Sequence, residues 1–303
     1  MNPVASLTTI VIVVRSASVS GLKGVRHSAE PRRGWVREVI AVAALSVLAT
    51  AAGSSAPEAA AVRVRAPEGS AHGFLVLRGT NLDPLAEGDW WQIVNGDRLE
   101  VHLRFRFTNG SLSHETFELQ QRGVWKLLTY RSIQRGPSFP RDIDAQLNRD
   151  SGHYRVETKD RGKSDSKVDE GTIEVPDDAY PFGLLGLLLK NLKRGESIRA
   201  HAVAFTPKPR VLKLDVSPDG DESVSIHGLP RKTLRYVAKA ELGGPLGAVA
   251  SIAGKQPPAL HCWMAGDPVP TFVRLDGPLY PDGPIWRAEL AAPTWPDAKQ
   301  HTR

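Results

Sequence analysis

The chain has 303 residues, of which 41% are hydrophobic and 24% are charged, so it can form one large soluble domain or two. Its net charge of +6 gives no argument for nucleic-acid binding, because residues 1–61 hold six Lys and Arg against three Glu and so contribute half of it. The single cysteine, Cys262, excludes an internal disulfide and is interpreted as a small core residue.

The first part of the sequence predicts a leader for export. The segment "PRRGWVREVIAVAALSVLATAAGSSAPEAAA" passes from basic residues through the apolar stretch Val39–Ala52 to small residues that suit signal cleavage. That stretch has 14 residues, fewer than the ~20 of a membrane-spanning helix, and a retained anchor is the alternative. We expect a signal segment at 1–61, with Val25 or Val36 as alternative starts, and a periplasmic or secreted protein without a stable membrane span after signal removal.

Alternation of apolar and polar residues predicts β-strands from about residue 72. In "RLEVHLRFRF", Arg98–Phe107, the apolar side chains point to one face and the charged ones to the other. Ten or so further segments repeat the pattern, and "RVLKLDV" and "ESVSIHG" are predicted as two strands joined by a turn at Asp219-Gly220. About twelve such strands predict a mainly β fold, an antiparallel meander that forms a strongly curved sheet or a partly closed barrel.

The predicted boundaries follow from this pattern. We expect a linker at 62–71, a single β-rich domain over 72–297 and a tail at 298–303.

One helix interrupts the strands. The segment "PDDAYPFGLLGLLLKNLKRG" has helix start and stop signals in the right order, and they predict a helix at 181–194. Its interior is apolar on nearly all sides, which predicts a buried helix that fills the concave face of the sheet. A lid or a membrane-touching helix is the alternative. Substitutions of Leu188 would distinguish the buried helix from the lid.

The run "GAVASIAGKQPP", Gly247–Pro258, ends in a Gly-Lys pair but is no phosphate loop. The glycine spacing is wrong, Gln256 replaces the Ser or Thr that binds Mg²⁺, and two prolines prevent a helix after Lys255. It is interpreted as a compact turn between strands.

The C-terminal part resembles a family of uncharacterised exported bacterial all-β proteins, filed as a domain of unknown function. The resemblance lies in a Gly-Gly strand end, the "GKQPP" turn, a strand with Trp263, "GPLY" at 277–280 and "GPIWR" at 283–287, in this order. It extends back to "VPDDAYPFGLLGLLLKNL" and covers residues 72–297. The resemblance implies the fold and the compartment but no reaction.

Searches for catalytic and metal motifs predict no catalytic, cofactor-binding or metal residues. The chain has no G-x-S-x-G or H-E-x-x-H motif, and its nine histidines show no ligand spacing.

Charged residues on the strand faces opposite the apolar ones give the remaining candidates. The first interpretation is a solvated outer surface with cross-strand ion pairs. The alternative is a polar interior that holds an anionic head group, with tryptophans at its rim. The candidate ligand contacts are Arg104, Arg106, Arg155, Arg235, Arg274, Arg287, Trp263, Trp286 and Leu188.

Two functions of different class remain open. The first is a non-enzymatic envelope protein that binds a lipid-like, apolar or small anionic ligand, or acts as a structural partner; no nucleic acid is expected. The second is a hydrolase or isomerase with a site assembled from distant residues. A pocket with paired carboxylates or a perturbed histidine would favour the second, and a long apolar groove would favour the first.

Overall fold

The computed structural model describes residues 59–226, 229–241, 257–266 and 269–291. The leader up to residue 58, the turn that contains Lys255, and the tail lie outside the described residues, so the predictions made for them stay predictions.

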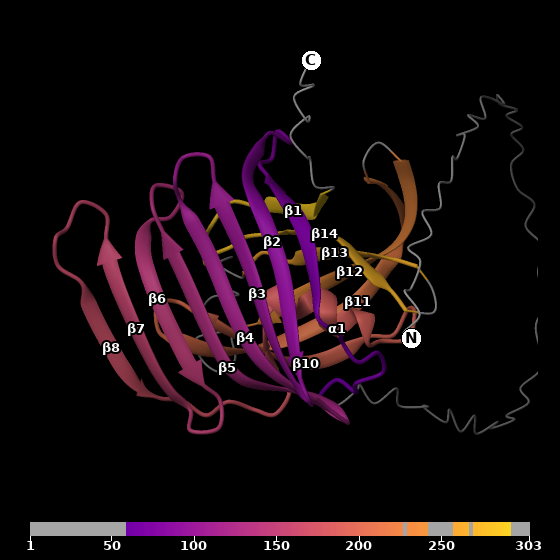
Figure 1. The fold of residues 1–303 in the computed structure, drawn as a ribbon, viewed down its shortest axis with the longest axis horizontal. Coiled ribbons are helices and arrows are strands. Elements are labelled where there is room, and N and C mark those ends of the chain that lie inside the picture. Colours follow the sequence, from indigo (N-terminus) through magenta and orange to yellow (C-terminus); the bar gives the residue numbers. More distant parts are fainter. Residues whose placement is uncertain (1–58, 227–228, 242–256, 267–268, 292–303) are drawn as a thin grey trace, which may run out of the picture. The chain divides into compact units, whose positions relative to one another are not determined.

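The described chain forms a single sheet of fifteen strands and two short helical turns (Figure 1). The elements are β1 (Ala71–Arg78), β2 (Pro84–Asn95), β3 (Arg98–Phe107), β4 (Leu112–Arg122), β5 (Val124–Arg135), β6 (Arg141–Asn148), β7 (His153–Asp160), β8 (Lys167–Thr172), β9 (Ala179–Pro181), the 3₁₀ turn η1 (Phe182–Leu184), α1 (Leu185–Lys190), β10 (Ile198–Phe205), β11 (Pro209–Ile226), β12 (Leu229–Glu241), β13 (Leu260–Ala265), β14 (Thr271–Gly277) and β15 (Trp286–Ala291).

The first and last strands pair in the middle of the sheet. From the β1–β15 pair, one meander runs outward to β8 and another runs outward to β10, where the short β9 adds in parallel. The other pairs are antiparallel, so the predicted antiparallel meander is confirmed. The two strands predicted on either side of Asp219-Gly220 are one strand, β11, because a bulge between Pro218 and Asp221 absorbs the break in the alternation.

The sheet is strongly curved, as predicted, and the described strands do not close into a barrel. In Figure 1, β1 to β8 form one wall, β10 to β14 lie behind it, and α1 lies between them. The curvature stacks the ring of Tyr130 (β5) on that of Phe205 (β10), with centroids 5.0 Å apart. Near the sheet edges, Lys208 Nζ lies 2.9 Å from Asp169 Oδ2.

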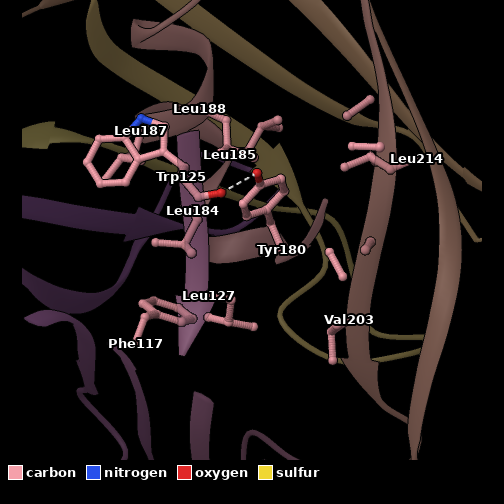
Figure 2. Close-up of a cluster of buried hydrophobic side chains, with 14 of the residues drawn as sticks. Phe117, Trp125, Leu127, Tyr180, Leu184, Leu185, Leu187, Leu188, Val203 and Leu214 are labelled. Carbon is pink, nitrogen blue, oxygen red and sulfur yellow. Dashed lines mark hydrogen bonds between the residues drawn. The ribbon is translucent and has the colours of Figure 1, made fainter. Parts of the chain in front are cut away.

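The helical segment fills part of the concave side. Gly183 lies so close to Glu115 and Phe117 of β4 that an added Cβ would fall within 3 Å of both, and Gly186 lies equally close to Phe272 of β14. Glycine at these two positions therefore lets the helix contact both walls of the sheet. Figure 2 shows Leu184, Leu185 and Leu188 among the buried side chains of this core.

The buried apolar helix is confirmed, but it is shorter than the predicted 181–194. It ends before Asn191, whose buried side chain accepts hydrogen bonds from the backbone N–H groups of Arg65 and Ala66 at 2.8 and 2.9 Å. This amide also donates to the carbonyl of Leu187 at 2.9 Å. The chain leaves the helix where this polar contact begins. Within the described residues, no helix is long and apolar enough to cross a membrane.

A tyrosine joins the helical segment to the first wall. Tyr180 donates its hydroxyl proton to the carbonyl of Trp125 at 2.7 Å (Figure 2) and accepts the N–H of Val62 at 3.1 Å. Burial raises the pKa of Tyr180 to about 12. Val62 lies in the segment predicted as a linker, and here it is a buried part of the core.

Candidate functional site

The concave side of the sheet has two halves, which the same strands line. In the first, here called the plug half, η1 and α1 cover the sheet, and the side chains beneath them are apolar and buried, such as Leu99, Phe117 and Leu127. In the second, the pocket half, the strands continue past the helix and line a partly open cavity of about 840 Å³.

Apolar side chains form most of the wall of this cavity. They come from both walls of the sheet and from the loop after β14; the main ones are Leu75, Leu103, Phe105, Ile143, Val203, Phe205, Leu212, Leu260, Phe272, Leu275, Leu279 and Leu290. Packed aromatic rings lie behind one side of this wall: Phe139 contacts Phe107 and Tyr280 edge-on, at 5.5 and 5.7 Å between centroids, and Tyr280 lines the cavity.

One face of the helix forms the boundary of the cavity. Gly183, Gly186, Leu187 and Lys190 line it, at the spacing that places residues on one side of a helix, while Leu188 is buried in the plug half. The helix therefore acts both as a core element and as a wall of the pocket.

Polar side chains on β4 and β5 form a patch on this otherwise apolar wall. Ser113 lies opposite Gln134, and Glu115 lies opposite Ser132, in the register of the two strands. A bulge at Leu128 shifts the alternation of β5, so that Trp125 and Leu127 point inward before it and Tyr130, Ser132 and Gln134 point inward after it. The inner polar patch, as we call it, consists of Ser113, Glu115, Tyr130, Ser132 and Gln134, all of which line the cavity.

A carboxyl and a phenol are the centre of this patch. Tyr130 donates its hydroxyl proton to Glu115 Oε1 at 2.5 Å. Burial raises the pKa of Glu115 above its ordinary value, although the hydrogen bond from Tyr130 acts in the opposite direction. Burial, together with the charge of Glu115, raises the pKa of Tyr130 well above its ordinary value. The pair can accept hydrogen bonds from a group in the cavity or exchange a proton with it.

Gln134 fixes a loop that covers the cavity. Its Nε2 donates to the carbonyl of Leu279 at 2.6 Å, across 145 positions of the sequence. Residues 278–282 all line the cavity, so this single bond ties the loop after β14 to β5.

A second polar group lies beside the helix. Lys190 Nζ is 2.7 Å from Glu68 Oε1, and Gln92 donates to the other oxygen of Glu68 at 2.8 Å. Trp90 donates to Gln92 at 3.0 Å. These four side chains all line the cavity, and the bonds between them satisfy both oxygens of the Glu68 carboxylate.

The predicted charged residues lie on the opposite, outer face of the sheet. Arg104 and Arg106 each place a guanidinium nitrogen 3.0 Å from Asp89 Oδ2. Burial would raise the pKa of Asp89, but the hydrogen bond from Arg104, with His72 and Arg106, holds it below its ordinary value. The two Asp89 contacts join β2 to β3 and are the cross-strand ion pairs of the first interpretation. Arg155 pairs with Glu157 at 3.2 Å, within the one strand β7.

Four more of the predicted residues gather around Glu222 and Asp276. Arg235 lies 3.3 Å and the indole nitrogen of Trp263 lies 3.0 Å from Glu222 Oε2, and the guanidinium of Arg274 lies 4.0 Å above the Trp263 ring. Arg274 and Arg287 both bond to Asp276, at 2.7 and 3.3 Å. These two arginines also line a smaller hollow of about 570 Å³ between the end of β11 and strands β1 and β15.

The remaining predicted residues are buried. Trp286 packs with Phe107 and Phe139 behind the cavity, and Leu188 lies in the core of the plug half. Among the described residues, the cavity lining includes none of the nine candidates. That they contact a ligand stays a prediction, which no observation here tests.

The sequence contains one signal for the inner polar patch. In "SLSHETFEL" the inward positions read Ser111, Ser113, Glu115, Phe117 and Leu119, so the apolar face becomes polar at one end. A half-polar inward face on neighbouring strands indicates a cavity rather than a continuous core.

Metal or thiol chemistry has no candidate in the part of the chain that the structure describes. No group of three His, Cys, Asp or Glu there could hold a metal ion. Cys262 is buried, and burial raises the pKa of its thiol far above the usual range, as expected for a core cysteine.

Comparisons with known proteins name no activity. No family model matches the chain, and no curated protein matches it. The structure is similar to the crystal structure of a β-barrel-like protein of the domain of unknown function DUF1849 from Brucella abortus, with a TM-score of 0.41 and 10% identity. The match covers 76% of this chain and 98% of the neighbour. The family that the sequence resembles, and the export that this resemblance implies, stay predictions.

Proposed function

We propose that this chain is an exported envelope protein that binds an apolar or lipid-like ligand in the pocket half of its sheet and catalyses no reaction. The observation that carries the proposal is the cavity of about 840 Å³ between the helix and the two walls. Ligand pockets range over about 300–1,000 Å³ and combine apolar walls with few polar groups, and this cavity has both properties.

The composition of the cavity supports binding over catalysis. A hydrolase or isomerase was expected to place paired carboxylates or a perturbed histidine in the pocket. The described lining residues include no histidine, and Glu115 has a phenol as its hydrogen-bond partner. Beyond the inner polar patch, most of the wall consists of aliphatic and aromatic side chains, which suit the hydrocarbon part of a ligand.

Export is the second part of the proposal and rests on the sequence alone. Basic, apolar and small residues follow one another over positions 32–61, the order found in signal peptides. Cell fractionation with sequencing of the mature N-terminus tests it. We expect a start near residue 62 in the envelope or the medium, and an intact leader on cytoplasmic protein would contradict it.

The binding proposal is tested with the uncharged probe N-phenylnaphthylamine, whose fluorescence rises in apolar surroundings. We expect saturable binding to the full chain and a loss of about tenfold or more in affinity for Ser113→Phe, which fills the cavity from the inner face of β4.

Ser217→Phe is the matched control, because this serine is exposed on β11 and lines neither the cavity nor the smaller hollow. It should bind the probe like the parent. Equal binding by all three proteins, or binding that never saturates, would contradict a ligand site in the pocket half.

A further inference from the structure

We infer that the ligand of the pocket half is a cationic amphiphile, with an ammonium head at the inner polar patch and a hydrocarbon chain along the apolar wall. The inference rests on the proposed function and adds the chemistry of the head group, which follows from the charge of Glu115 and from the hydrogen bonds already made around it.

Glu115 is a carboxyl without a cation. Within the described residues no Lys, Arg or His forms an ion pair with it, and its recorded partner is the Tyr130 hydroxyl on Oε1. A carboxylate that is removed from water without a counter-ion is costly, and a cation that enters the cavity would remove this cost. The raised pKa of Glu115 has the same physical cause.

The patch offers more acceptors than donors to a ligand. The one proton of Tyr130 goes to Glu115, and the amide nitrogen of Gln134 donates to Leu279. The second oxygen of Glu115 and the amide oxygen of Gln134 remain as acceptors, the hydroxyls of Ser113 and Ser132 can accept or donate, and the second N–H of Gln134 is the remaining amide donor. An ammonium group has up to three N–H donors and no acceptor, so it complements such a set.

The cations that line the cavity lie elsewhere. Lys190 pairs with Glu68 at 2.7 Å, and Arg210 is exposed and donates to the hydroxyl of Thr206 at 2.9 Å. A carboxylate or phosphate head at the inner polar patch would therefore meet Glu115 with no described cation beside it. Charge complementarity favours an ammonium there over an anion.

The test compares three ligands with one chain and different heads: dodecylamine, dodecanol and dodecanoate. The displacement of N-phenylnaphthylamine from the full chain by each ligand is measured at neutral pH. The amine and the carboxylate are kept below their micelle concentrations, and dodecanol below its solubility limit. For the parent we expect dodecylamine to bind about tenfold more tightly than dodecanol, and dodecanoate to bind more weakly than either.

Glu115→Gln keeps the shape of the side chain and an oxygen for the Tyr130 proton, but removes the charge. We expect it to reduce dodecylamine binding about tenfold, to the level of dodecanol, and to leave dodecanol within about twofold. Glu118→Gln is the control, because Glu118 lies on the same strand but points to the other face, and it should match the parent. Thermal melts check that all variants are folded.

The outcomes separate the inference from the proposed function. If all three ligands displace the probe with equal affinity, or if Glu115→Gln leaves the preference for the amine unchanged, the cavity binds apolar chains but the assigned head group is wrong. Tighter binding of dodecanoate than of dodecylamine would overturn the inference in the same way. If none of the three displaces the probe, the proposed function fails and the inference fails with it.

Discussion

The plug half and the pocket half are lined by the same strands, yet they differ in what covers them. On β4, Phe117 and Leu119 are fully buried beneath the helix, whereas Ser113 and Glu115, four and two residues before Phe117 on the same face, line the cavity. On β5 the change follows the bulge at Leu128. A single curved sheet can thus build a packed core and a ligand cavity side by side, when the inward residues change from apolar to polar where the helix ends.

The plug half should be the more sensitive to loss of side-chain volume. Leu188→Ala removes a buried side chain from close-packed surroundings and should lower the free energy of unfolding by about 2–5 kcal/mol. Leu275→Ala removes a half-buried side chain that already faces the cavity, so it should cost less. Urea unfolding of both variants measures the difference. Equal losses would show that the two halves are packed alike.

The pocket half should show its character in the pH dependence of stability. The folded-state pKa of Glu115 is raised above its ordinary value of 4.5, so the folded protein holds this proton more tightly than the unfolded chain. The contribution to stability is therefore present below pH 4.5 and is lost as the pH rises through the folded-state pKa.

Glu115→Gln removes this loss. Relative to the parent, the variant should become more stable as the pH rises above 4.5, and the difference should level off above the folded-state pKa. Urea unfolding over a pH series checks this, with Glu118→Gln on the outer face as the control. Parallel pH profiles for parent and Glu115→Gln would mean that Glu115 is well solvated and the pocket half is not apolar.

The outer face should matter least. Arg131 holds Asp144 with two hydrogen bonds, at 3.0 and 2.8 Å, but both lie on the solvent side of the sheet. Asp144→Asn should cost only about 0.2–1 kcal/mol, and less at high salt, because exposed pairs are screened. Unfolding at low and high salt measures it. A loss as large as that of Leu188→Ala would remove the contrast between the inner and outer faces.

The sequence predicted those strands and the helix whose residues follow a pattern visible within the element itself. The alternation from Leu99 to Phe107 predicts β3 because each of its inward positions is apolar, and the helix signals around Leu188 predict a buried helix. The predicted helix extends too far toward the C-terminus. It ends before Asn191 in the structure, where the side chain of Asn191 accepts hydrogen bonds from the backbone of Arg65 and Ala66, more than a hundred positions away in the sequence.

The inner polar patch could not be predicted from local sequence patterns either, because it too depends on contacts between residues that are distant in the sequence. Glu115 belongs to a cavity only because Tyr130 turns inward after the bulge at Leu128, and because Gly183 lets the helix approach β4. The charged residues that the sequence favoured, such as Arg104 and Arg274, have the visible pattern of a strand face, but the structure pairs them with Asp89 and Asp276 outside the cavity. Contacts between distant strands decide which face is hollow.

The central claim is that the pocket half holds the hydrocarbon chain of a ligand while the plug half stays packed. A crystal structure of the full chain with dodecylamine tests it most directly. We expect density for the chain along Leu75, Phe272 and Leu275, with its nitrogen within hydrogen-bond distance of Glu115 and with Leu188 in the position described here. An empty cavity with dodecylamine bound only on the outer face, or a helix displaced from the plug half by the ligand, would contradict the account.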